Sequence, residues 1–393
     1  MEPVILPDAP WRHRPGLSRV VEALGPEKAR FVGGAVRDTL LGIDTSDVDI
    51  ATVHAPERVI ALLTGNGIKA VPTGLAHGTI TAVADHDVVE VTTLRCDVAT
   101  DGRHATVAFS TDWREDAARR DFTINALYAD PVSGQVFDYF GGLKDLKARR
   151  VRFIGDPYRR IAEDHLRILR FFRFHARFGE EVDAEALEAC AARANDLMAL
   201  SRERIASELL KLLVAPNALP AVELMVQHGI LVPVLPEIDS GGIARLTILA
   251  AREPEPVAIR RLAALLPPAA KIAEDVGARL KLSKSDRKRL TSATQSTGDE
   301  GPRGLAYRIG PVWATDRLLL AGEDIGPLSD WAPPSLPIGG GALVERGVSA
   351  GPEVATLLRA VETQWIAEDF PDASRVEQIA DDAVAQWRVV KNA

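Results

Sequence analysis

Two aspartates separated by a single valine, Asp47 and Asp49, form a pair of side chains suited to metal chemistry. In a β-strand, residues i and i+2 point to the same face, and the apolar Val48 and Ile50 are consistent with a strand. Two carboxylates on one face repel each other, and a pair of Mg²⁺ ions, which bind carboxylates together with substrate phosphates, would offset that repulsion. Such a metal pair activates an attacking hydroxyl and stabilises a leaving pyrophosphate. The alternative is that Asp47 caps a turn and Asp49 is only exposed.

Glu90, in the run VVEVTTLR, is a third candidate carboxylate for the same chemistry. The run has the β-branched composition of a strand, where an isolated acid is unusual. A catalytic position and an exposed strand face explain Glu90 equally well.

Gly33 and Gly34 join a short apolar run to a helical pattern in the segment FVGGAVRDTLLG. Glycine lets a phosphate approach the backbone closely, and the N-terminus of the following helix favours anions. Arg37, in the first turn, adds a bidentate phosphate contact. The segment therefore predicts a site for nucleotide phosphates, although a Gly-Gly turn by itself is more often only structural.

The segment RRDFTINALYAD, residues 119–130, carries a second candidate phosphate ligand, Arg120, beside Asp121. A guanidinium at this position would hold a triphosphate. The apolar stretch that follows is predicted to be helical, and its Asn125 is included among the candidate nucleotide-binding residues. An ion pair at the start of that helix is the alternative role for Arg120.

Asp164 and Arg167 are predicted to be neighbours, because they are three residues apart in the helical pattern IAEDHLRILRFFRF. A carboxylate accepts a hydrogen bond from an exocyclic amine, and a guanidinium donates to the adjacent ring acceptor. Cytosine and adenine present that pattern and uracil and guanine do not, so the pair would select C and A. Arg170 and Arg173 continue the row of threes, with Arg173 about half a turn from Asp164 at ~100° per residue. A surface ion pair is the alternative.

Two kinds of predicted structure carry these residues. Short β-rich runs alternate with Gly/Asp turns and helical patterns from Arg30 to about Asp138. From about Asp156 onward, apolar residues recur three and four positions apart, as in helices. The predicted fold class is therefore α+β, with an α/β head domain, a boundary near 140–156 and a long helical part.

Two further segments flank these patterns. Residues 1–29 are predicted to be a lead-in with one short helix near Leu17–Leu24. Residues 330–349, rich in proline and glycine, are predicted to be a loop before a last helix.

Composition limits the class of protein. None of the 393 residues belongs to a stretch approaching the ~20 apolar residues of a membrane span. The two cysteines, Cys96 and Cys190, exclude a disulfide framework and a cysteine-rich zinc site. Free thiols, and an N-terminus without the pattern of a signal peptide, favour a cytoplasmic protein.

The net charge of −8 argues against a nucleic-acid-binding protein, because such proteins usually carry a basic surface, but the charge is unevenly spread. Residues 144–178 include eleven Lys/Arg and four Asp/Glu. A second basic cluster, RLKLSKSDRKRL, contains Lys281, Lys284 and Lys288. A basic face of this kind would hold an RNA backbone, and for the second cluster a solvated helix face is an equal alternative.

Several motifs occur in one order along the chain, namely GGAVRDTLLG with DVD, VEVTTLR, DGRHATVAF, RRDFTINAL, FDYFGG, EDHLRILRFFRF and SRERIASELLKLL. This order resembles that of the bacterial-type (class II) CCA-adding enzymes and poly(A) polymerases, and the resemblance is dense over 30–213. It implies a polymerase-β-like nucleotidyltransferase head followed by an all-helical neck, body and tail. The implied domains are a lead-in at 1–29, the catalytic head at 30–155, a neck with the nucleotide-selecting helix at 156–215, and an RNA-binding body and tail at 216–393.

The resemblance also implies roles for positions of this chain. It places the metal-binding carboxylates on Asp47 and Asp49, with Mg²⁺ as the cofactor. The nucleotide contacts that it implies are Gly34, Arg37, Arg120, Asp164, Arg167, Arg170 and Arg173. Segment Cys96–Trp113 would be a mobile loop that helps to switch from C to A addition. Ala342 stands where the family's C-terminal segment usually has an aspartate, so no role is carried over to it.

The activity that the resemblance implies is addition of CCA to the 3′ end of tRNA from CTP and ATP, with the tail gripping the tRNA and no protein partner. A poly(A) polymerase or an enzyme that adds only A uses the same motifs, and the pair of Asp164 and Arg167 does not separate the three. A non-catalytic RNA-binding protein is disfavoured by the intact pair of Asp47 and Asp49. Nucleotide transfer to a small molecule is disfavoured by the long helical part.

Overall fold

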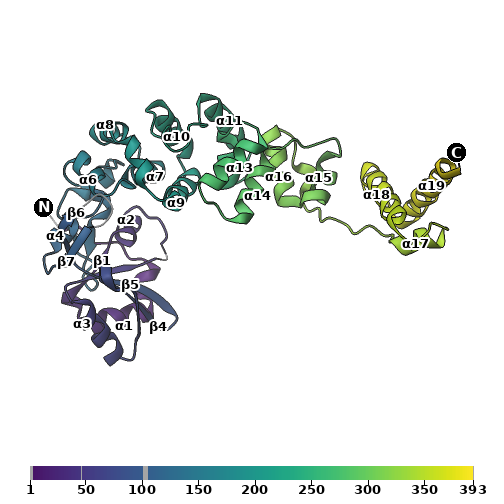
Figure 1. Cartoon of the computed structure of the whole chain (residues 1–393). Coiled ribbons are helices and arrows are strands. Elements are labelled where there is room, and N and C mark those ends of the chain that lie inside the picture. The colour runs from purple at the N-terminus through teal and green to yellow at the C-terminus, as the bar shows by residue number, and fades with distance from the viewer. Residues whose placement is uncertain (1–2, 46, 101–104, 393) are drawn as a thin grey trace. The chain divides into compact units, whose positions relative to one another are not determined.

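The computed structural model describes residues 3–45, 47–100 and 105–392, and its elements are labelled in Figure 1. The chain divides into two compact units, 1–236 and 237–393. The first unit contains a β-sheet with its covering helices and then helices alone, and the described residues of the second unit form helices and connecting loops. This confirms the predicted fold class, a sheet-containing head followed by a helical remainder.

The head is built on a seven-stranded sheet with the order β3-β4-β5-β2-β1-β8-β9. Neighbouring strands are antiparallel except β2 and β5, which are parallel. The central strands are almost entirely buried, as expected for strands covered on both faces, whereas the edge strand β3 is not. The strands of the sheet are β1 (Ala29–Val32), β2 (Asp49–Thr52), β3 (Lys69–Gly74), β4 (Thr79–Ala84), β5 (Asp87–Thr93), β8 (Leu127–Ala129) and β9 (Val136–Asp138).

Helices α1 (Pro15–Leu24) and α3 (Pro56–Gly65) pack against each other and against β4 and β5. Each begins with a proline, whose fixed φ and missing N–H suit the first helical position. The helix predicted near Leu17–Leu24 is α1 and is thereby confirmed. The other helices of the head are α2 (Gly34–Leu40), α4 (Trp113–Ala118) and α5 (Gly142–Lys147).

The prediction of a helix within 119–130 is wrong. Thr123–Asn125 form a single 3-10 turn, and Leu127–Ala129 form β8, which pairs with both β1 and β9. Every residue from 121 to 129 is buried. A short run that is buried on all sides has no periodicity by which a strand is distinguished from a helix, so the sequence pattern did not show this one.

A separate two-stranded sheet is formed by β6 (Arg95–Thr100) and β7 (Ala105–Phe109). Apart from Arg95, the first residue of β6, both strands lie within Cys96–Trp113, the segment for which the resemblance implies a mobile loop. Residues 101–104 of that segment lie outside the described residues. Its described part is paired antiparallel strand on both sides, and its mobility stays a prediction.

Helices follow the head within the first unit, and one predicted helix is divided in two. The continuous helix predicted for 161–179 is wrong, because α6 ends at Glu163 and α7 begins only at Arg167. Asp164 between them has extended backbone angles (φ −150°, ψ 107°), and its Oδ1 accepts a hydrogen bond from the Leu166 N–H at 3.1 Å. Such local bonds are how aspartate competes with a helix. The helices are α6 (Pro157–Glu163), α7 (Arg167–Phe178), α8 (Ala184–Ala192), α9 (Arg202–Leu213) and α10 (Ala218–Gln227).

Aromatic rings attach α7 to the head. Phe171 stacks on Phe153 with centroids 5.9 Å apart, and Phe174 meets Phe122 edge-on at 5.4 Å. Phe122 and Phe153 contact each other at 4.9 Å, and all four rings are buried. Each such pair contributes about 0.5–1.5 kcal/mol beyond its buried area. The arginines on α7 are therefore held in a fixed position relative to the head.

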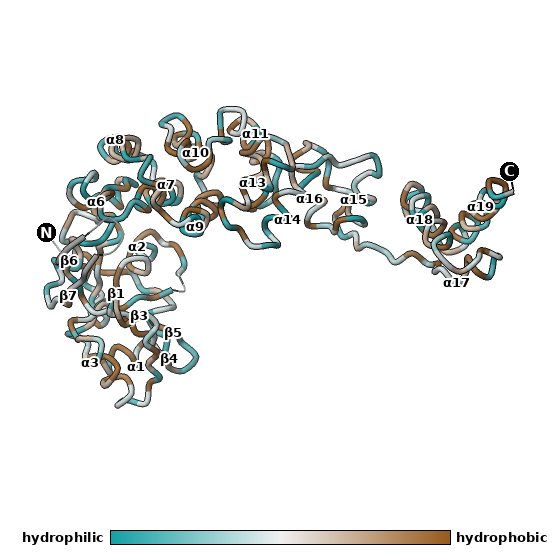
Figure 2. Tube along the Cα trace, in the orientation of Figure 1, coloured by the Kyte–Doolittle hydropathy of each residue, from teal (hydrophilic) through white to brown (hydrophobic). Residues whose placement is uncertain are grey.

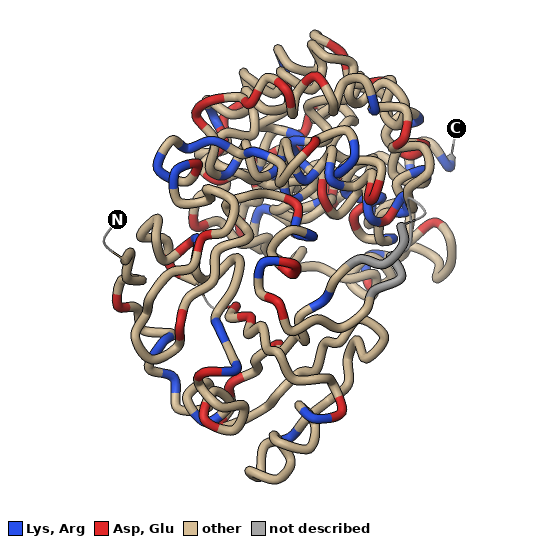
Figure 3. The backbone as a smooth tube through the Cα atoms, turned by 90° about the vertical axis from the view of Figure 1, so that its left-hand side faces the viewer, with Lys and Arg blue, Asp and Glu red and all other residues tan. Residues whose placement is uncertain are grey.

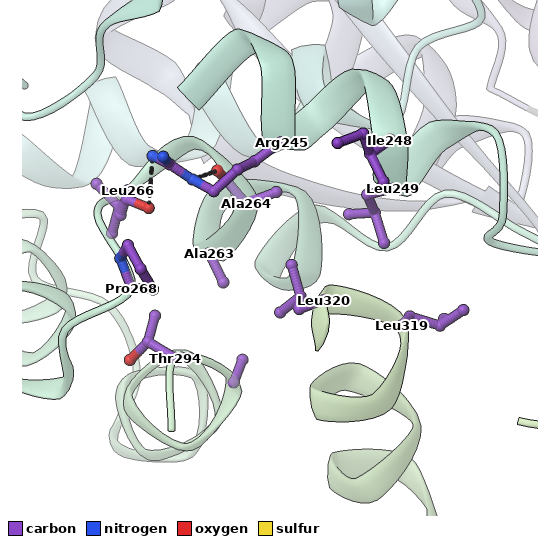
Figure 4. A pocket seen from close by; sticks show the side chains of 11 residues that line it. Arg245, Ile248, Leu249, Ala263, Ala264, Leu266, Pro268, Thr294, Leu319 and Leu320 are labelled. Atoms are coloured by element: carbon purple, nitrogen blue, oxygen red, sulfur yellow. Dashed lines mark hydrogen bonds between the residues drawn. The ribbon is translucent and has the colours of Figure 1, made fainter. Parts of the chain in front are cut away.

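In the helices of the second unit, hydrophobic and hydrophilic residues are interspersed along the chain (Figure 2). Figure 4 shows an apolar pocket where α11, α12, α14 and α16 meet, with Arg245 at its side. Arg245 donates to the carbonyls of Ala264 and Leu266, each at 2.9 Å, and so satisfies carbonyls that the end of α12 leaves open. The helices are α11 (Ser240–Ala250), α12 (Ala258–Leu265), α13 (Ala270–Arg279), α14 (Lys284–Ala293), α15 (Gly301–Ile309), α16 (Pro311–Ala321), α17 (Gly340–Glu345), α18 (Pro352–Ala367) and α19 (Ala373–Asn392).

The loop predicted for 330–349 is wrong in one part, because it contains α17. Leu343 of this short helix is fully buried in a core with Val361 and Trp365 of α18. That long-range contact stabilises helix in a segment whose glycines disfavour it.

Charged residues of both signs are interspersed along the backbone (Figure 3). Among the described helices, none has both the length and the apolar composition that crossing a membrane requires.

Candidate functional site

Asp49 is the first residue of β2, and its partner on the parallel strand β5 is Glu90. The sheet therefore places Asp49 and Glu90, two of the three predicted carboxylates, side by side on neighbouring strands. Asp47 and Asp49 are exposed, whereas Val48 and Ile50 are buried. The alternation of exposed and buried residues therefore extends back to Asp47, although β2 itself begins only at Asp49. It places both aspartates on one face, as their spacing predicts.

The pKa of the Asp49 carboxyl is raised above its usual value, because nearby protein removes water from it and because Glu90 and Asp47 carry negative charge. Arg120 acts in the opposite direction. Because Asp49 is exposed as a whole residue, we attribute the raised pKa mainly to the negative charges of Glu90 and Asp47. A bound cation would favour the ionised form of such a group.

The fit of a metal to this site follows from its donor set. The described residues contain no group of three or more Cys, His, Asp or Glu side chains close enough to hold an ion by themselves. Magnesium is usually bound by one or two carboxylates together with substrate phosphates and water. Asp47 and Asp49 fit a site of this type, in which two protein carboxylates bind the ion and the phosphates of the nucleotide complete its coordination.

Gly33 occupies the turn between β1 and α2 with a left-handed φ of +69°, which glycine adopts without strain. Its N–H donates to the Leu127 carbonyl at 3.1 Å, so the turn is attached to β8. A Cβ added to Gly33 would lie 3.4 Å from Nη1 of Arg120. Two of the predicted phosphate ligands, the glycine turn and Arg120, are therefore adjacent.

A series of hydrogen bonds connects α2 with α7 through buried polar side chains. Arg37 donates from Nη1 to Asn125 Oδ1 at 2.5 Å and from Nε to Asp38 Oδ1 at 2.7 Å. Asn125 donates from Nδ2 to Asp121 Oδ1 at 3.0 Å. The other oxygen of Asp121 accepts from Arg170 Nε at 2.8 Å and pairs with its Nη2 at 2.6 Å. The structure thus brings together three predicted nucleotide-binding residues from distant parts of the chain.

Arg120 is held by Asp116 and Tyr128. Its Nε and Nη2 donate to Asp116 Oδ2 at 3.3 and 3.2 Å, and its Nε also donates to the Tyr128 hydroxyl at 3.1 Å. The Tyr128 hydroxyl donates to the same carboxylate oxygen at 2.6 Å. The predicted alternative, an ion pair at the start of a helix, is wrong in its position, because Asp116 is within α4 and Arg120 follows the end of that helix.

The side chains of Asp164 and Arg167 do not pair, although the Arg167 N–H donates to the Asp164 carbonyl at 3.0 Å. Nη2 of Arg204, on α9, donates to both oxygens of Asp164 at 3.0 and 3.2 Å. Arg167 donates from Nη1 to Glu163 Oε2 at 2.7 Å and to the Arg160 carbonyl at 2.8 Å. The prediction that they are helix neighbours is wrong because Asp164 lies between α6 and α7. Their role in selecting the base stays a prediction.

Glu208 on α9 binds two arginines of α7, Arg170 and Arg173. Its Oε2 accepts from Arg173 Nε at 2.5 Å, and its Oε1 lies 3.9 Å from Arg170 Nη1. Only 5% of Glu208 is exposed, so its charge depends on these partners. Arg170 also pairs with Asp121, whereas the acidic partner of Arg173 is Glu208, so the two arginines share one carboxylate and differ in the other.

Lys281, Lys284 and Lys288, the candidate RNA contacts, are exposed in the second unit. Lys284 and Lys288 are one turn apart on α14, and Lys281 precedes that helix. Arg287 of the same cluster is ion-paired with Glu274. The three lysines therefore provide exposed positive charge, and their contact with RNA stays a prediction.

Three residues of this site, Asp116, Glu208 and Arg204, were not singled out by sequence reasoning. A usable signal existed for Glu208, because it falls on the apolar face of its helix between Ile205 and Leu212. A carboxylate at such a position needs a buried cationic partner. Asp116 and Arg204 have no comparable signal, since both lie in charged stretches.

Comparison with known proteins identifies the family. Residues 29–152 match the family model described as the poly A polymerase head domain, and 181–241 match the probable RNA and SrmB-binding site of polymerase A. The mouse mitochondrial CCA tRNA nucleotidyltransferase 1 is 37% identical over 383 residues, which cover 89% of this chain and 86% of that protein. The human protein of the same name is 37% identical over 389 residues, with the same coverage of 89% and 86%.

The chain belongs to the CCA tRNA nucleotidyltransferase family. This confirms the resemblance found in the motifs and identifies the chain as a nucleotidyltransferase. A crystal structure of the Bacillus stearothermophilus CCA-adding enzyme in complex with CTP matches with a TM-score of 0.77 and 26% identity, over 96% of this chain and 99% of that chain. CCA tRNA nucleotidyltransferases use a divalent metal.

Proposed function

We propose that the chain adds C, C and A in that order to the 3′ end of tRNA, using CTP, ATP and Mg²⁺ and releasing pyrophosphate. The hydrogen-bonded series from Arg37 through Asn125 and Asp121 to Arg170 carries this proposal. It joins the glycine turn, where the triphosphate would bind, to the helix that follows the base-selecting residues. The residues that bind the phosphates and those that select the base would then be held in a fixed position relative to each other, as addition without a template requires.

The side chains of the head would bind and orient both reacting groups. Gly33 leaves the backbone open beside Arg120, so that Arg120 and Arg37 contact the triphosphate. Asp47 and Asp49 would hold Mg²⁺ together with triphosphate oxygens, with Glu90 beside them on β5. Bound there, the metal would activate the 3′ hydroxyl and neutralise charge on the leaving pyrophosphate.

Base selection would rest on Asp164 and Arg167 at the start of α7. The carboxylate of Asp164 would accept from the exocyclic amine of cytosine or adenine, and Arg167 would donate to the adjacent ring acceptor. Arg204 holds Asp164 by one nitrogen, and each carboxylate oxygen has lone pairs left for a base. Arg170 and Arg173 would support this pocket from the following turns.

The proposal retains the expected organisation of a catalytic head at 30–155, a neck at 156–215 and a body and tail at 216–393. Lys281, Lys284 and Lys288 would contact tRNA phosphates in the second unit. A cytoplasmic location stays the prediction from the sequence, whereas the mouse and human relatives are mitochondrial by name.

An incorporation assay tests the proposal. The purified chain with Mg²⁺ is given tRNA transcripts that end before CCA, after C or after CC, with each NTP alone and in combination. Ordered addition that stops after CCA is the expected result. Addition of A only to the CC-ended transcript would indicate an A-adding enzyme, and unlimited A on any RNA would indicate a poly(A) polymerase. No incorporation would leave a non-catalytic RNA-binding protein.

A further inference from the structure

A cavity of about 430 Å³ lies in the first unit, and Arg173 is the one residue of its lining that is also assigned to the nucleotide. Its walls combine cationic and apolar side chains from three segments: the loop after α2, helix α7, and the end of α9 with the residues that follow it. The lining residues are Ile43, Arg173, Arg177, Lys211, Val214, Ala215 and Pro216.

The cavity has an excess of positive charge. Arg173 is paired with Glu208, and Arg177 donates to Asp38 Oδ2 at 3.2 Å. In the described part of the chain, Lys211 makes no hydrogen bond or ion pair, and it is exposed. Glu208 and Asp38 are themselves shared with Arg170 and Arg37. The ion-paired cluster thus holds four arginines, Arg37, Arg170, Arg173 and Arg177, against three carboxylates, Asp38, Asp121 and Glu208. Lys211 adds a further positive charge at the wall of the cavity.

Position along α7 separates this cavity from the base-selecting residues. Arg167 begins α7, and the two arginines of the cavity, Arg173 and Arg177, follow it by six and ten residues, which at ~1.5 Å per residue is about 9 and about 15 Å along the helix axis. Ile43 is four residues before Asp47, so the two are at most about 14 Å apart at ~3.3–3.6 Å per residue. The cavity is therefore too far from Arg167 to share its base, yet close enough to the metal-binding loop for a neighbouring nucleotide of the same strand.

We propose that this cavity binds a backbone phosphate and the adjoining ribose of the RNA acceptor strand just before its reacting 3′ end. Lys211 and Arg177 contact the phosphate, and Val214 and Pro216 contact the sugar. A flexible single strand is bound in this way by a positive groove with apolar contacts. The inference rests on the proposed function and assigns to its RNA substrate a place that adjoins the nucleotide site, with which it shares Arg173.

Lys211→Glu is the decisive variant, because Lys211 is exposed and lies outside the ion pairs that hold α7. Lys69→Glu, an equally exposed lysine on edge strand β3, is the matched control with the same change in charge. We expect Lys211→Glu to raise the KM for tRNA roughly tenfold while kcat and the KM for CTP stay within about twofold. Val214→Trp, which fills the cavity without a change in charge, should raise the KM for tRNA in the same direction.

Direct binding of tRNA at several salt concentrations is the second measurement. Replacing Lys211 by alanine should lower the slope of log K against log salt by about 1, since about one counterion is released per phosphate neutralised. Equal behaviour of Lys211→Glu and Lys69→Glu would overturn the inference, and so would a rise in the KM for CTP alone. If the wild-type chain incorporates no nucleotide, the proposed function fails, and the binding slopes still decide whether RNA occupies this cavity.

Discussion

The carboxylate of Asp164 is held by Arg204, forty residues further along the chain, and not by the nearby Arg167. One guanidinium nitrogen spans both carboxylate oxygens, which fixes the plane of the carboxylate while leaving lone pairs free. Arg204 is thereby a positioning residue for the base-selecting group.

Replacing Arg204 by methionine is expected to relax nucleotide choice. Without Arg204, only the Leu166 N–H still holds the Asp164 carboxylate, through Oδ1, so the plane of the carboxylate is less fixed. The penalty of about 1–3 kcal/mol for leaving a polar group unpaired against a mismatched base is then partly lost. The ratio of kcat/KM for CTP to that for UTP should fall by about tenfold, with single-nucleotide incorporation as the measurement. Arg202→Met, on the first turn of the same helix, is the control. An unchanged ratio in the Arg204 variant would contradict the positioning role.

The long-range partners are the part of this site that sequence reasoning did not reach. The spacing of Asp47 and Asp49 was enough to predict a shared face, because strand geometry has a period of two. The pairing of Asp164 with Arg204 depends on how α9 packs on α7, and no local pattern encodes that packing. The same holds for Glu208 and its two arginines.

Element boundaries were misjudged where one side chain or one strand pairing outweighed periodicity. The predicted helix is interrupted at Asp164, where the Leu166 N–H donates a hydrogen bond to the side chain of Asp164. The stretch containing Asn125 became a turn and a strand, because β8 is needed between β1 and β9. In contrast, the division into a sheet-containing head and a helical remainder followed directly from the periods of two and of three to four.

Asp49→Asn is expected to abolish most incorporation while leaving tRNA binding unchanged. The amide keeps the shape of the side chain and removes the charge that binds Mg²⁺. Since the metal contributes several kcal/mol of charge stabilisation and ~1.4 kcal/mol corresponds to tenfold in rate, kcat should fall about a thousandfold or more. Asp44→Asn, an exposed aspartate of the same loop, should retain activity. Strong residual activity of Asp49→Asn would refute the metal assignment.

Gly33→Ala separates backbone strain from crowding at the nucleotide site. Gly33 and Gly67 have nearly equal φ values of +69° and +70°, but only the added Cβ at Gly33 has side-chain neighbours within 4 Å, the nearest being Arg120. Both alanine variants should lose about 1–3 kcal/mol of stability from the positive φ, with the larger loss at Gly33, whose ψ of −117° lies outside the left-handed helical region. Only Gly33→Ala should raise the KM for CTP and ATP. Equal nucleotide KM values in both variants would show that the turn does not contact the triphosphate.

Asp121 should make the stability of the first unit depend on pH. Burial by itself raises the pKa of the Asp121 carboxyl. The charge of Arg170 and the hydrogen bonds from Asn125 and the Phe122 N–H lower that pKa by more than burial raises it, so the pKa is below its usual value. A depressed pKa stabilises the folded state above the unfolded value of about 3.9, and that contribution is lost as the pH falls through the folded pKa.

Asp121→Asn is therefore expected to be destabilised by about 2–3 kcal/mol at neutral pH, because it removes the closer of the two carboxylates that pair with Arg170 and leaves only the longer contact with Glu208. The difference from the wild type should shrink as the pH falls below about 4. Melting temperatures measured by circular dichroism across this range provide the test. Asp85→Asn, at an exposed pair with Arg19, should show little change at any pH. A difference that is independent of pH would assign the effect to packing.

Asp116 is expected to control the position of Arg120 through its charge. Asp116 is 2% exposed, and besides Arg120 and the Tyr128 hydroxyl it accepts a hydrogen bond from the Arg95 N–H at 3.1 Å, at the start of β6. Asp116→Asn keeps an acceptor for the Arg95 N–H but removes the charge that holds Arg120. Tyr128→Phe removes only a hydroxyl and leaves the ion pair in place.

The two variants should therefore separate in nucleotide kinetics. Asp116→Asn should raise the KM for CTP and ATP about tenfold, as expected for a lost charge-assisted contact, whereas Tyr128→Phe should change it less than about threefold. The KM for tRNA should stay unchanged in both. Asp116→Ala, which also removes the acceptor for the Arg95 N–H, should additionally increase amide exchange at the base of β6. If Tyr128→Phe were as impaired as Asp116→Asn, the hydroxyl rather than the carboxylate would be what positions Arg120.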